Sequence, residues 1–226
     1  MADRLTPSGP VLDHLAARAA ALVVGRRRAV LGIAGCPGAG KTTLAQSLVA
    51  TLNGHRDGEP GWAVHVPLDG FHLADVELTR LELRDRKGAP ETFDAAGYVA
   101  LLRRIRDDEE EVTYAPAFER DLEQALAGAI PIERSTRLVV TEGNYLLMDD
   151  GPWKHVRGLL DETWFCDCDD AVRTARLADR HRALGKADAD AARWVAQVDE
   201  PNAVLVRPTR ALADLVVETT AAVPPG

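Results

Sequence analysis

Eight consecutive residues, 35–42, match the phosphate-binding loop pattern G-x-x-x-x-G-K-[ST] and constrain the fold more than any other feature of the chain. Glycines let backbone N–H groups curl around an anion, while the lysine reaches the β- and γ-phosphates and the threonine hydroxyl binds Mg²⁺. An apolar run at 28–34 precedes the loop, and apolar residues at helical spacing follow it at 43–52. This context favours a nucleoside-triphosphate site at a helix N-terminus over a glycine-rich turn that binds nothing.

The loop predicts a set of nucleotide-binding residues in which Lys41 also acts in catalysis and Thr42 also binds the metal. The set is Gly35, Cys36, Pro37, Gly38, Ala39, Gly40, Lys41, Thr42 and Thr43.

Composition narrows the class of protein and of partner. The 226 residues are 46% hydrophobic, which is typical of a globular protein, and one domain is expected. The net charge of −8 disfavours nucleic acid, whose backbone requires a basic face. Cys36, Cys166 and Cys168 lack metal-site spacing and favour reduced thiols in the cytoplasm, and no apolar run is long enough to span a membrane.

Strand and helix patterns alternate along nearly the whole chain, which predicts a three-layer α/β fold with a parallel sheet. Helices are expected in 1–27, at 94–106 with Asp94 as N-cap, and at 170–184. Two irregular excursions are expected over 71–93 and 113–131, and a frayed tail over 219–226. The predicted strands are 28–34, 63–68, 136–142, 162–166 and 214–218.

Two carboxylates follow apolar strands, at the sheet edge where open α/β folds bind ligands. Glu142 is expected to hold Mg²⁺ beside the loop, the alternative being a carboxylate that only meets solvent. Asp69 is expected to act as general base on a substrate hydroxyl, the alternative being turn chemistry with Gly70.

Arg173, Arg176 and Arg180 fall on one face of the 170–184 helix. They predict an arginine-rich lid that closes on the phosphates, with Arg176 and Arg180 as catalytic residues. A solvated surface face is the alternative.

Five further segments accompany the loop in the order seen in the phosphoribulokinase/uridine kinase family, which the chain resembles over residues 28–218. The resemblance extends to bacterial P-loop pantothenate kinases and to proteins called nucleoside/nucleotide kinases or fructose-transport-system kinases. The segments are P-L-D-G-F-H (67–72), R-K-G-A-P-E-T-F-D (86–94), Y-A-P-A-F (114–118), V-V-T-E-G-N (139–144) and R-P-T-R (207–210).

The resemblance implies a single P-loop kinase domain over 1–226, with its core at 28–218. It implies Asp69 as base and Glu142 as the Mg²⁺-side carboxylate. Arg210 would lie near the adenine. Arg120 takes the place of the substrate-binding histidine of pantothenate kinases, where it would suit an anionic acceptor or else pair with neighbouring acids. The acceptor-binding residues implied are Asp69, His72, Phe93, Arg120 and Asn144.

These features predict an ATP-dependent kinase that uses Mg²⁺ and phosphorylates a hydroxyl of a small metabolite, such as pantothenate, a sugar or a nucleoside. The alternative is a nucleotide-dependent switch with no small-molecule acceptor. A GTPase would need N-K-x-D and a transporter ATPase L-S-G-G-Q, and the chain contains neither motif. We expect no nucleic-acid or membrane partner, and a homodimer is left open.

Overall fold

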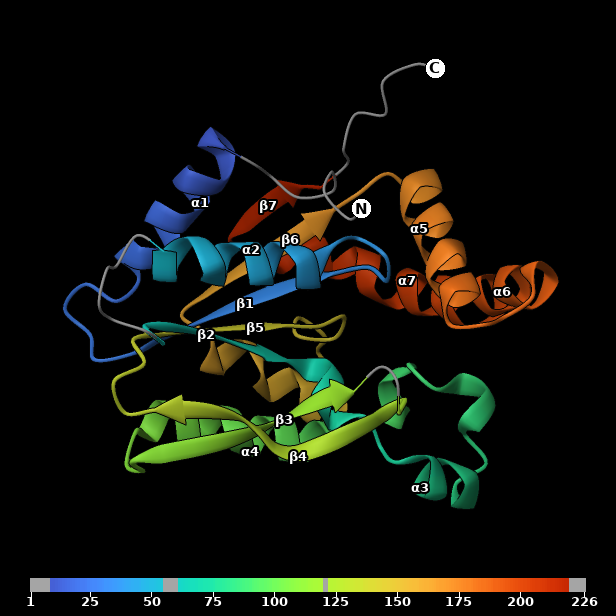
Figure 1. Cartoon of the computed structure of the whole chain (residues 1–226), viewed down its shortest axis with the longest axis horizontal. Helices are drawn as coiled ribbons and strands as arrows, with labels where there is room; N and C mark the ends of the chain where they lie inside the picture. The colour runs from blue at the N-terminus through green and yellow to red at the C-terminus, as the bar shows by residue number, and fades with distance from the viewer. Residues whose placement is uncertain (1–8, 55–60, 120–121, 220–226) are drawn as a thin grey trace.

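The computed structural model describes residues 9–54, 61–119 and 122–219. These residues form a five-stranded parallel sheet with the strand order β2-β5-β1-β6-β7 (Figure 1). This confirms the α/β class, and each strand lies where the apolar runs predict one. The strands are β1 (Ala29–Gly35), β2 (Ala63–Pro67), β5 (Leu138–Glu142), β6 (Glu162–Asp167) and β7 (Leu215–Glu218).

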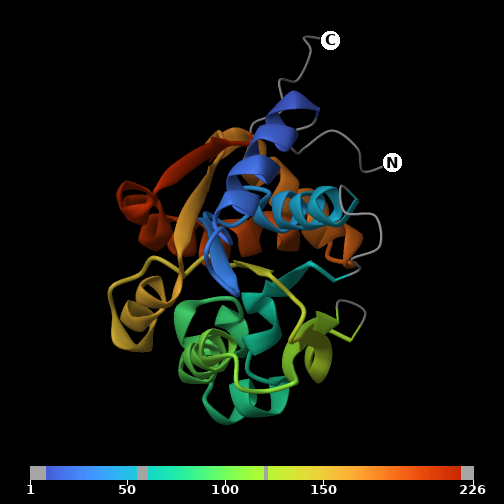
Figure 2. The same cartoon turned by 90° about the vertical axis from the view of Figure 1, so that its left-hand side faces the viewer.

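Helices cover both faces of this sheet and produce three layers, which are seen edge-on in Figure 2. The helices α1 and α2 pack on one face, while α4 and α7 contribute to the hydrophobic core on the other. β1 supplies both cores in alternation, since Val30 faces one and Leu31 the other. The helices are α1 (Pro10–Ala21), α2 (Lys41–Gly54), α3 (Asp75–Arg80), α4 (Ala95–Asp107), α5 (Asp170–Ala183), α6 (Asp188–Trp194) and α7 (Glu200–Val206).

The carboxyl ends of the central strands meet at one edge of the sheet. Glu142 ends β5 in register with Ile33 of β1 on one side and with Pro67 of β2 on the other. The phosphate-binding loop follows β1 directly, so the loop and Glu142 come together without any long connection. This edge is where an open parallel sheet binds ligands.

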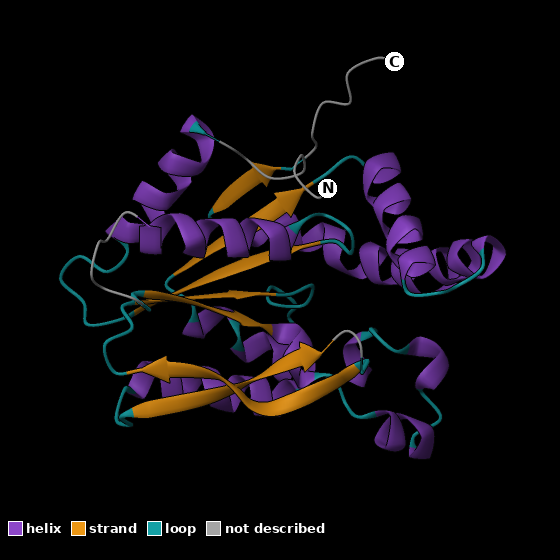
Figure 3. Ribbon diagram, viewed as in Figure 1, coloured by secondary structure: helices purple, strands orange, loops and turns teal. Residues whose placement is uncertain are grey.

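The segment 113–131 is more regular than an irregular excursion. An antiparallel pair forms there, β3 (Val112–Glu119) with β4 (Gln124–Glu133), below the main sheet in Figure 3. Most of β4 is exposed. Only a few side chains of the pair are buried, such as Ala115 of β3 and Ile132 of β4. Such a strand lacks the continuous apolar run of a buried one, which is why its sequence resembles a loop.

The segment 71–93 does lack long elements, as expected. It consists of α3 and short 3-10 turns at Leu68–Phe71, Arg84–Arg86 and Pro90–Thr92. At its end, the Asp94 side chain accepts a hydrogen bond from Gly97 N at 2.8 Å, which confirms this N-cap of α4.

The two ends of the chain lie partly outside the described residues. Thr219 belongs to the predicted frayed tail, but it is buried and its hydroxyl donates to Ala39 O at 2.6 Å, so the prediction is wrong at this position. No helix in the described part of the chain is long and apolar enough to cross a membrane.

Candidate functional site

The loop between β1 and α2 leads the chain into a tight turn under the N-terminus of α5. Gly38 has a φ of 79°, a left-handed conformation that glycine adopts without strain. A Cβ atom at this position would lie 2.6 Å from the backbone oxygen of Arg173. The close approach of the loop to α5 therefore depends on a residue without a side chain.

Lys41 is buried at the first position of α2. Its Nζ donates hydrogen bonds to Cys36 O at 3.0 Å and to Asn144 Oδ1 at 2.7 Å. Asn144 follows the end of β5, so it holds the lysine from the neighbouring strand of the sheet. The ammonium group has no acidic partner among the described residues and keeps its charge available for an anion.

Glu142 lies beside Thr42, and both residues carry oxygen ligands. The Thr42 hydroxyl donates to Glu142 Oε1 at 3.0 Å, and His65 Nε2 lies 3.6 Å from the same oxygen. Burial acts most strongly on the pKa of Glu142 and raises it, but His65, Lys41 and Thr42 together outweigh burial. The pKa therefore lies below its ordinary value, and the carboxyl group is ionised at neutral pH.

This pair fits the Mg²⁺ ion that such a loop implies. Mg²⁺ prefers oxygen ligands and is usually held by one or two protein groups together with substrate phosphates and water. A buried ionised carboxylate 3.0 Å from a hydroxyl, at the N-terminus of α2, is a donor set of this kind. Thr42 and Glu142 are therefore the residues that would hold the ion.

A cavity of about 1130 Å³ opens in front of the loop. It brings together thirteen of the residues that the sequence predicts, from segments far apart in the chain. They are Pro37, Gly38, Gly40, Lys41, Thr42, Thr43, Asp69, His72, Phe93, Glu142, Asn144, Arg176 and Arg180. Gly35, Cys36 and Ala39 belong to the loop but do not line the cavity.

Asp69 faces this cavity from the 3-10 turn after β2. The turn is fixed by a hydrogen bond of 2.8 Å between His72 Nδ1 and the backbone oxygen of Asp69. No hydrogen bond or ion pair to the Asp69 carboxylate occurs within the described ranges. The carboxylate is therefore free to accept a proton or a hydrogen bond from a ligand.

An aromatic wall stands next to Asp69. The His72 ring lies between Phe93, at a centroid distance of 4.0 Å, and Phe118, at 4.9 Å. Burial is the main cause that lowers the pKa of His72, with Asp69 opposing it, so the imidazole is neutral at neutral pH. The wall offers a ligand flat apolar surface and an uncharged polar ring.

Comparison with known proteins agrees with this geometry. The family model described as "Phosphoribulokinase / Uridine kinase family" matches residues 30–223.

The chain belongs to the phosphoribulokinase/uridine kinase family. It is therefore an ATP-dependent kinase in the broad sense of that family.

Three relatives illustrate the range of the family. A candidate uridine kinase of Schizosaccharomyces pombe is 34% identical over 177 residues, 76% of this chain and 74% of that protein. A pantothenate kinase of Rhodococcus opacus is 28% identical over 218 residues, 85% of this chain and 67% of that protein. A crystal structure of a candidate fructose transport system kinase from Silicibacter sp. TM1040 superimposes with a TM-score of 0.77 at 32% identity, covering 92% and 100% of the two chains.

The arginines of α5 do not share one role. Arg173 is buried and forms ion pairs with Asp170 at 2.7 Å and with Glu200 at 2.7 Å, so it binds α5 to α7 and faces no ligand. Arg176 reaches Thr219 O at 3.1 Å and lines the cavity beside the loop. Arg173 therefore does not share a phosphate-facing surface with Arg176 and Arg180. Helical spacing groups residues on one side of a helix but does not show which of them pack against the rest of the protein.

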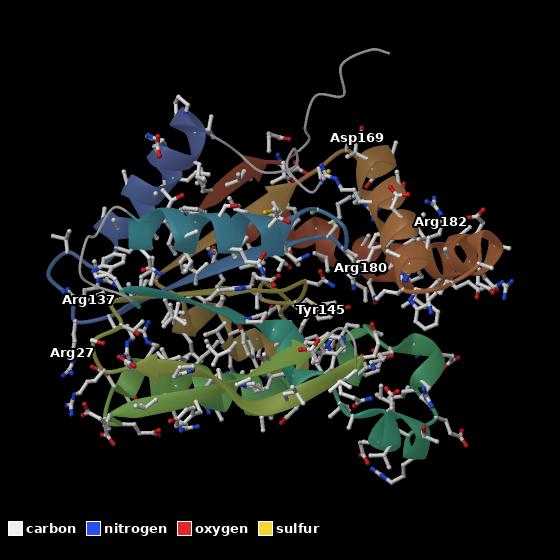
Figure 4. All side chains as sticks on the ribbon, viewed as in Figure 1. Arg27, Arg137, Tyr145, Asp169, Arg180 and Arg182 are labelled. Atoms are coloured by element: carbon white, nitrogen blue, oxygen red, sulfur yellow. The ribbon has the colours of Figure 1, made fainter. Side chains whose placement is uncertain are left out.

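Arg180 is placed differently, and Figure 4 shows it on the side of α5 toward Tyr145. It lines the cavity, and no hydrogen bond or ion pair to its guanidinium is found in the described part of the chain. Arg182 lies on the outer side of the helix and pairs with Asp179 and Asp188. Of the two, only Arg180 presents a cation to the cavity.

Two predicted contacts are not seen at the cavity. Arg210 is half-exposed and donates from Nε to Asp167 Oδ2 at 2.7 Å, and it does not line the cavity. Its pairing with Asp167 was not visible in the sequence, where the two residues stand far apart. Arg120 lies outside the described residues.

Several residues that line the cavity were not predicted from the sequence. Lys87 belongs to a family segment but was given no role, while His181, Lys186, Trp194 and Asp199 carried no motif at all. The last four residues come together through the packing of α5 against α6 and the helical segment after it, which periodicity does not reveal.

Proposed function

We propose that this kinase transfers the γ-phosphoryl group of ATP to a hydroxyl group of a small metabolite, with Asp69 as general base. One observation carries the proposal. The unpaired carboxylate of Asp69 and the phosphate-binding Lys41 line the same cavity, although they come from different strands. Phosphoryl transfer requires an activated nucleophile and a stabilised phosphate at one place.

Groups around the loop bind the phosphates of ATP and stabilise the negative charge on the transferring phosphoryl group. Backbone N–H groups of the loop bind the phosphates, and Lys41 moves from Asn144 toward the β- and γ-phosphates. Arg180 supplies a second cation toward the transferring group from the helix above. Bound Mg²⁺ would neutralise phosphate charge, and Thr42 and Glu142 would hold it.

Asp69 acts at the opposite end of the transfer. The acceptor hydroxyl donates its hydrogen bond to the carboxylate and gives up its proton as the oxygen attacks phosphorus. Phe93 and Phe118 give this end of the cavity an apolar surface, and His72 between them stays neutral. The aromatic wall and the Asp69 carboxylate together orient the acceptor for the transfer step.

The acceptor is a hydroxylated metabolite. The names of the relatives reported above refer to uridine, pantothenate and fructose, and all three compounds carry hydroxyl groups. The size of the cavity supports binding of ATP together with such a molecule.

Asp69→Asn tests the role of the base. Loss of the proton acceptor should lower kcat by roughly 10²–10⁴ while leaving the Kd for ATP nearly unchanged. Asp85→Asn, an exposed acid that does not line the cavity, is the matched control and should keep wild-type kinetics. Weakened ATP binding or an unfolded Asp69→Asn protein would show that this residue holds the turn or the metal instead.

A further inference from the structure

One wall of the cavity is built by a single run of helical chain. The helix α6 continues through a π-helical turn, Val195–Asp199, into α7. Turns of this type are rare and are often found at functional sites, because they shift the side chains that follow. Here the run carries Trp194, Asp199 and Asn202 to the cavity.

Asp199 is held in place by α5. Its Oδ2 lies 2.8 Å from Nε2 of His181, and the other ring nitrogen, Nδ1, is buried with no hydrogen-bond partner within the described ranges. The imidazole therefore contacts one oxygen of Asp199 and fixes the orientation of the carboxylate.

The second carboxylate oxygen of Asp199, Oδ1, has no protein donor among the described residues. No hydrogen bond to Oδ1 occurs in the described part of the chain, yet Asp199 lines the cavity and Oδ1 is not sealed off from it. The pKa of Asp199 lies above its ordinary value, mainly because the carboxyl group is buried. His181 and Arg180 lower this pKa in part, and Glu200 raises it further. An acceptor atom without a protein donor is satisfied by a donor on the ligand.

The cations on the opposite wall are already compensated. Lys87 and Arg84 both pair with Asp75, at 2.8 Å and 3.0 Å, and Lys87 also donates to Glu123 O at 2.6 Å. Lys186 lies on the wall of Asp199 itself, where its ammonium stands over the Trp194 ring, 4.5 Å from the ring centroid. Lys41 and Arg180 also line the cavity without an ion pair among the described residues, and the proposed function assigns both of them to the phosphates.

We propose that Asp199 binds hydroxyl groups of the acceptor, and that the acceptor is an uncharged polyhydroxylated molecule of the class of sugars, sugar alcohols and nucleosides. This inference rests on the proposed function and narrows its acceptor. Hydrogen bonds from hydroxyl groups to a carboxylate are charge-assisted and therefore strong. A carboxylate or phosphate on the acceptor would be repelled by Asp199 and would find the cations of the opposite wall already paired.

The first test is a matched acceptor panel with the full-length protein, ATP and Mg²⁺. Free sugars, sugar alcohols and nucleosides are compared with the sugar acids, sugar phosphates and nucleoside monophosphates of the same carbon skeletons. ADP release and product mass are scored. We expect the uncharged members to be phosphorylated with kcat/KM at least ~10-fold above their anionic counterparts.

The second test separates acceptor binding from a structural role. Using the best neutral acceptor, Asp199→Ala should raise its KM at least ~10-fold with the KM for ATP unchanged. His181→Ala removes the same internal hydrogen bond but keeps the carboxylate, so it should raise the acceptor KM far less. Asp190→Ala, an acid on the exposed side of α6 that does not line the cavity, should have no effect.

Equal effects of Asp199→Ala and His181→Ala on the acceptor KM would overturn the inference and make the pair purely structural. Preference for the anionic members would also overturn it, while leaving the kinase function intact. Phosphorylation of no member of either set would instead contradict the proposed function. The panel uses wild-type protein, so it decides the acceptor class even if a variant fails to fold.

Discussion

Replacement of Gly38 by alanine should damage both the stability of the protein and its affinity for ATP. The residue has a φ of 79°, which costs an alanine about 1–2 kcal/mol. The new Cβ would also lie 2.6 Å from Arg173 O and 2.9 Å from Leu177 Cγ. The first of these atoms is backbone of α5, so the strain must move the loop or the helix, at about 1–3 kcal/mol more.

Gly25 provides the matched control, because its φ of 72° is nearly the same and a Cβ there would meet nothing within 4 Å. Gly25→Ala should lower the free energy of unfolding only by the cost of the left-handed backbone conformation, about 1–2 kcal/mol. Gly38→Ala should lose about 2–5 kcal/mol in total and bind ATP at least ~10-fold more weakly, because the displaced loop no longer directs its N–H groups at the phosphates.

Urea unfolding followed by tryptophan fluorescence gives the two free energies, and calorimetric titration with ATP gives the Kd. The contrast between the variants isolates the steric contribution of α5 from the backbone strain that both share. Equal stability losses in the two variants, together with wild-type ATP affinity of Gly38→Ala, would refute the claim that the loop is packed against α5.

Two further substitutions test the cations of the site. Lys41→Ala should lower kcat at least ~100-fold and leave the fold intact, and near-normal turnover by the folded variant would contradict the proposed role; steady-state kinetics and circular dichroism give both readouts. Arg180→Ala should lower kcat at least ~10-fold, whereas Arg182→Ala on the outer side of the same helix should not, and equal rates of these two variants would remove Arg180 from the transfer step.

The strands and the loop were predictable because their signals are local. A fully buried parallel strand such as β1 reads as an uninterrupted apolar run, and the glycine-lysine pattern at its end has one structural meaning in that context. The position of Glu142 beside the loop was predictable for the same reason, since Glu142 ends another buried strand at the same edge of the sheet. In each case the residue types specify the local structure without knowledge of distant partners.

Other features depend on partners that a pattern does not contain. Helical spacing placed Arg173 with Arg176 and Arg180, but ion pairs with Asp170 and Glu200 hold the buried Arg173 between α5 and α7. The contact of His181 with Asp199 requires a π-helical turn whose sequence is not distinctive. These interactions arise from packing between segments, so the sequence did not reveal the wall that contains Asp199, although it did indicate Asp69, His72 and Phe93.

A kinase that phosphorylates a metabolite releases ADP only when the acceptor is present, and this dependence can be measured. ADP release by the wild-type protein is followed with ATP and Mg²⁺, with and without each member of the acceptor panel, and the products are identified by mass. We expect ADP release that depends on an acceptor, together with a product heavier by one phosphoryl group. ADP release at the same rate without any acceptor, and no phosphorylated product with any panel member, would contradict it and favour a nucleotide-dependent switch.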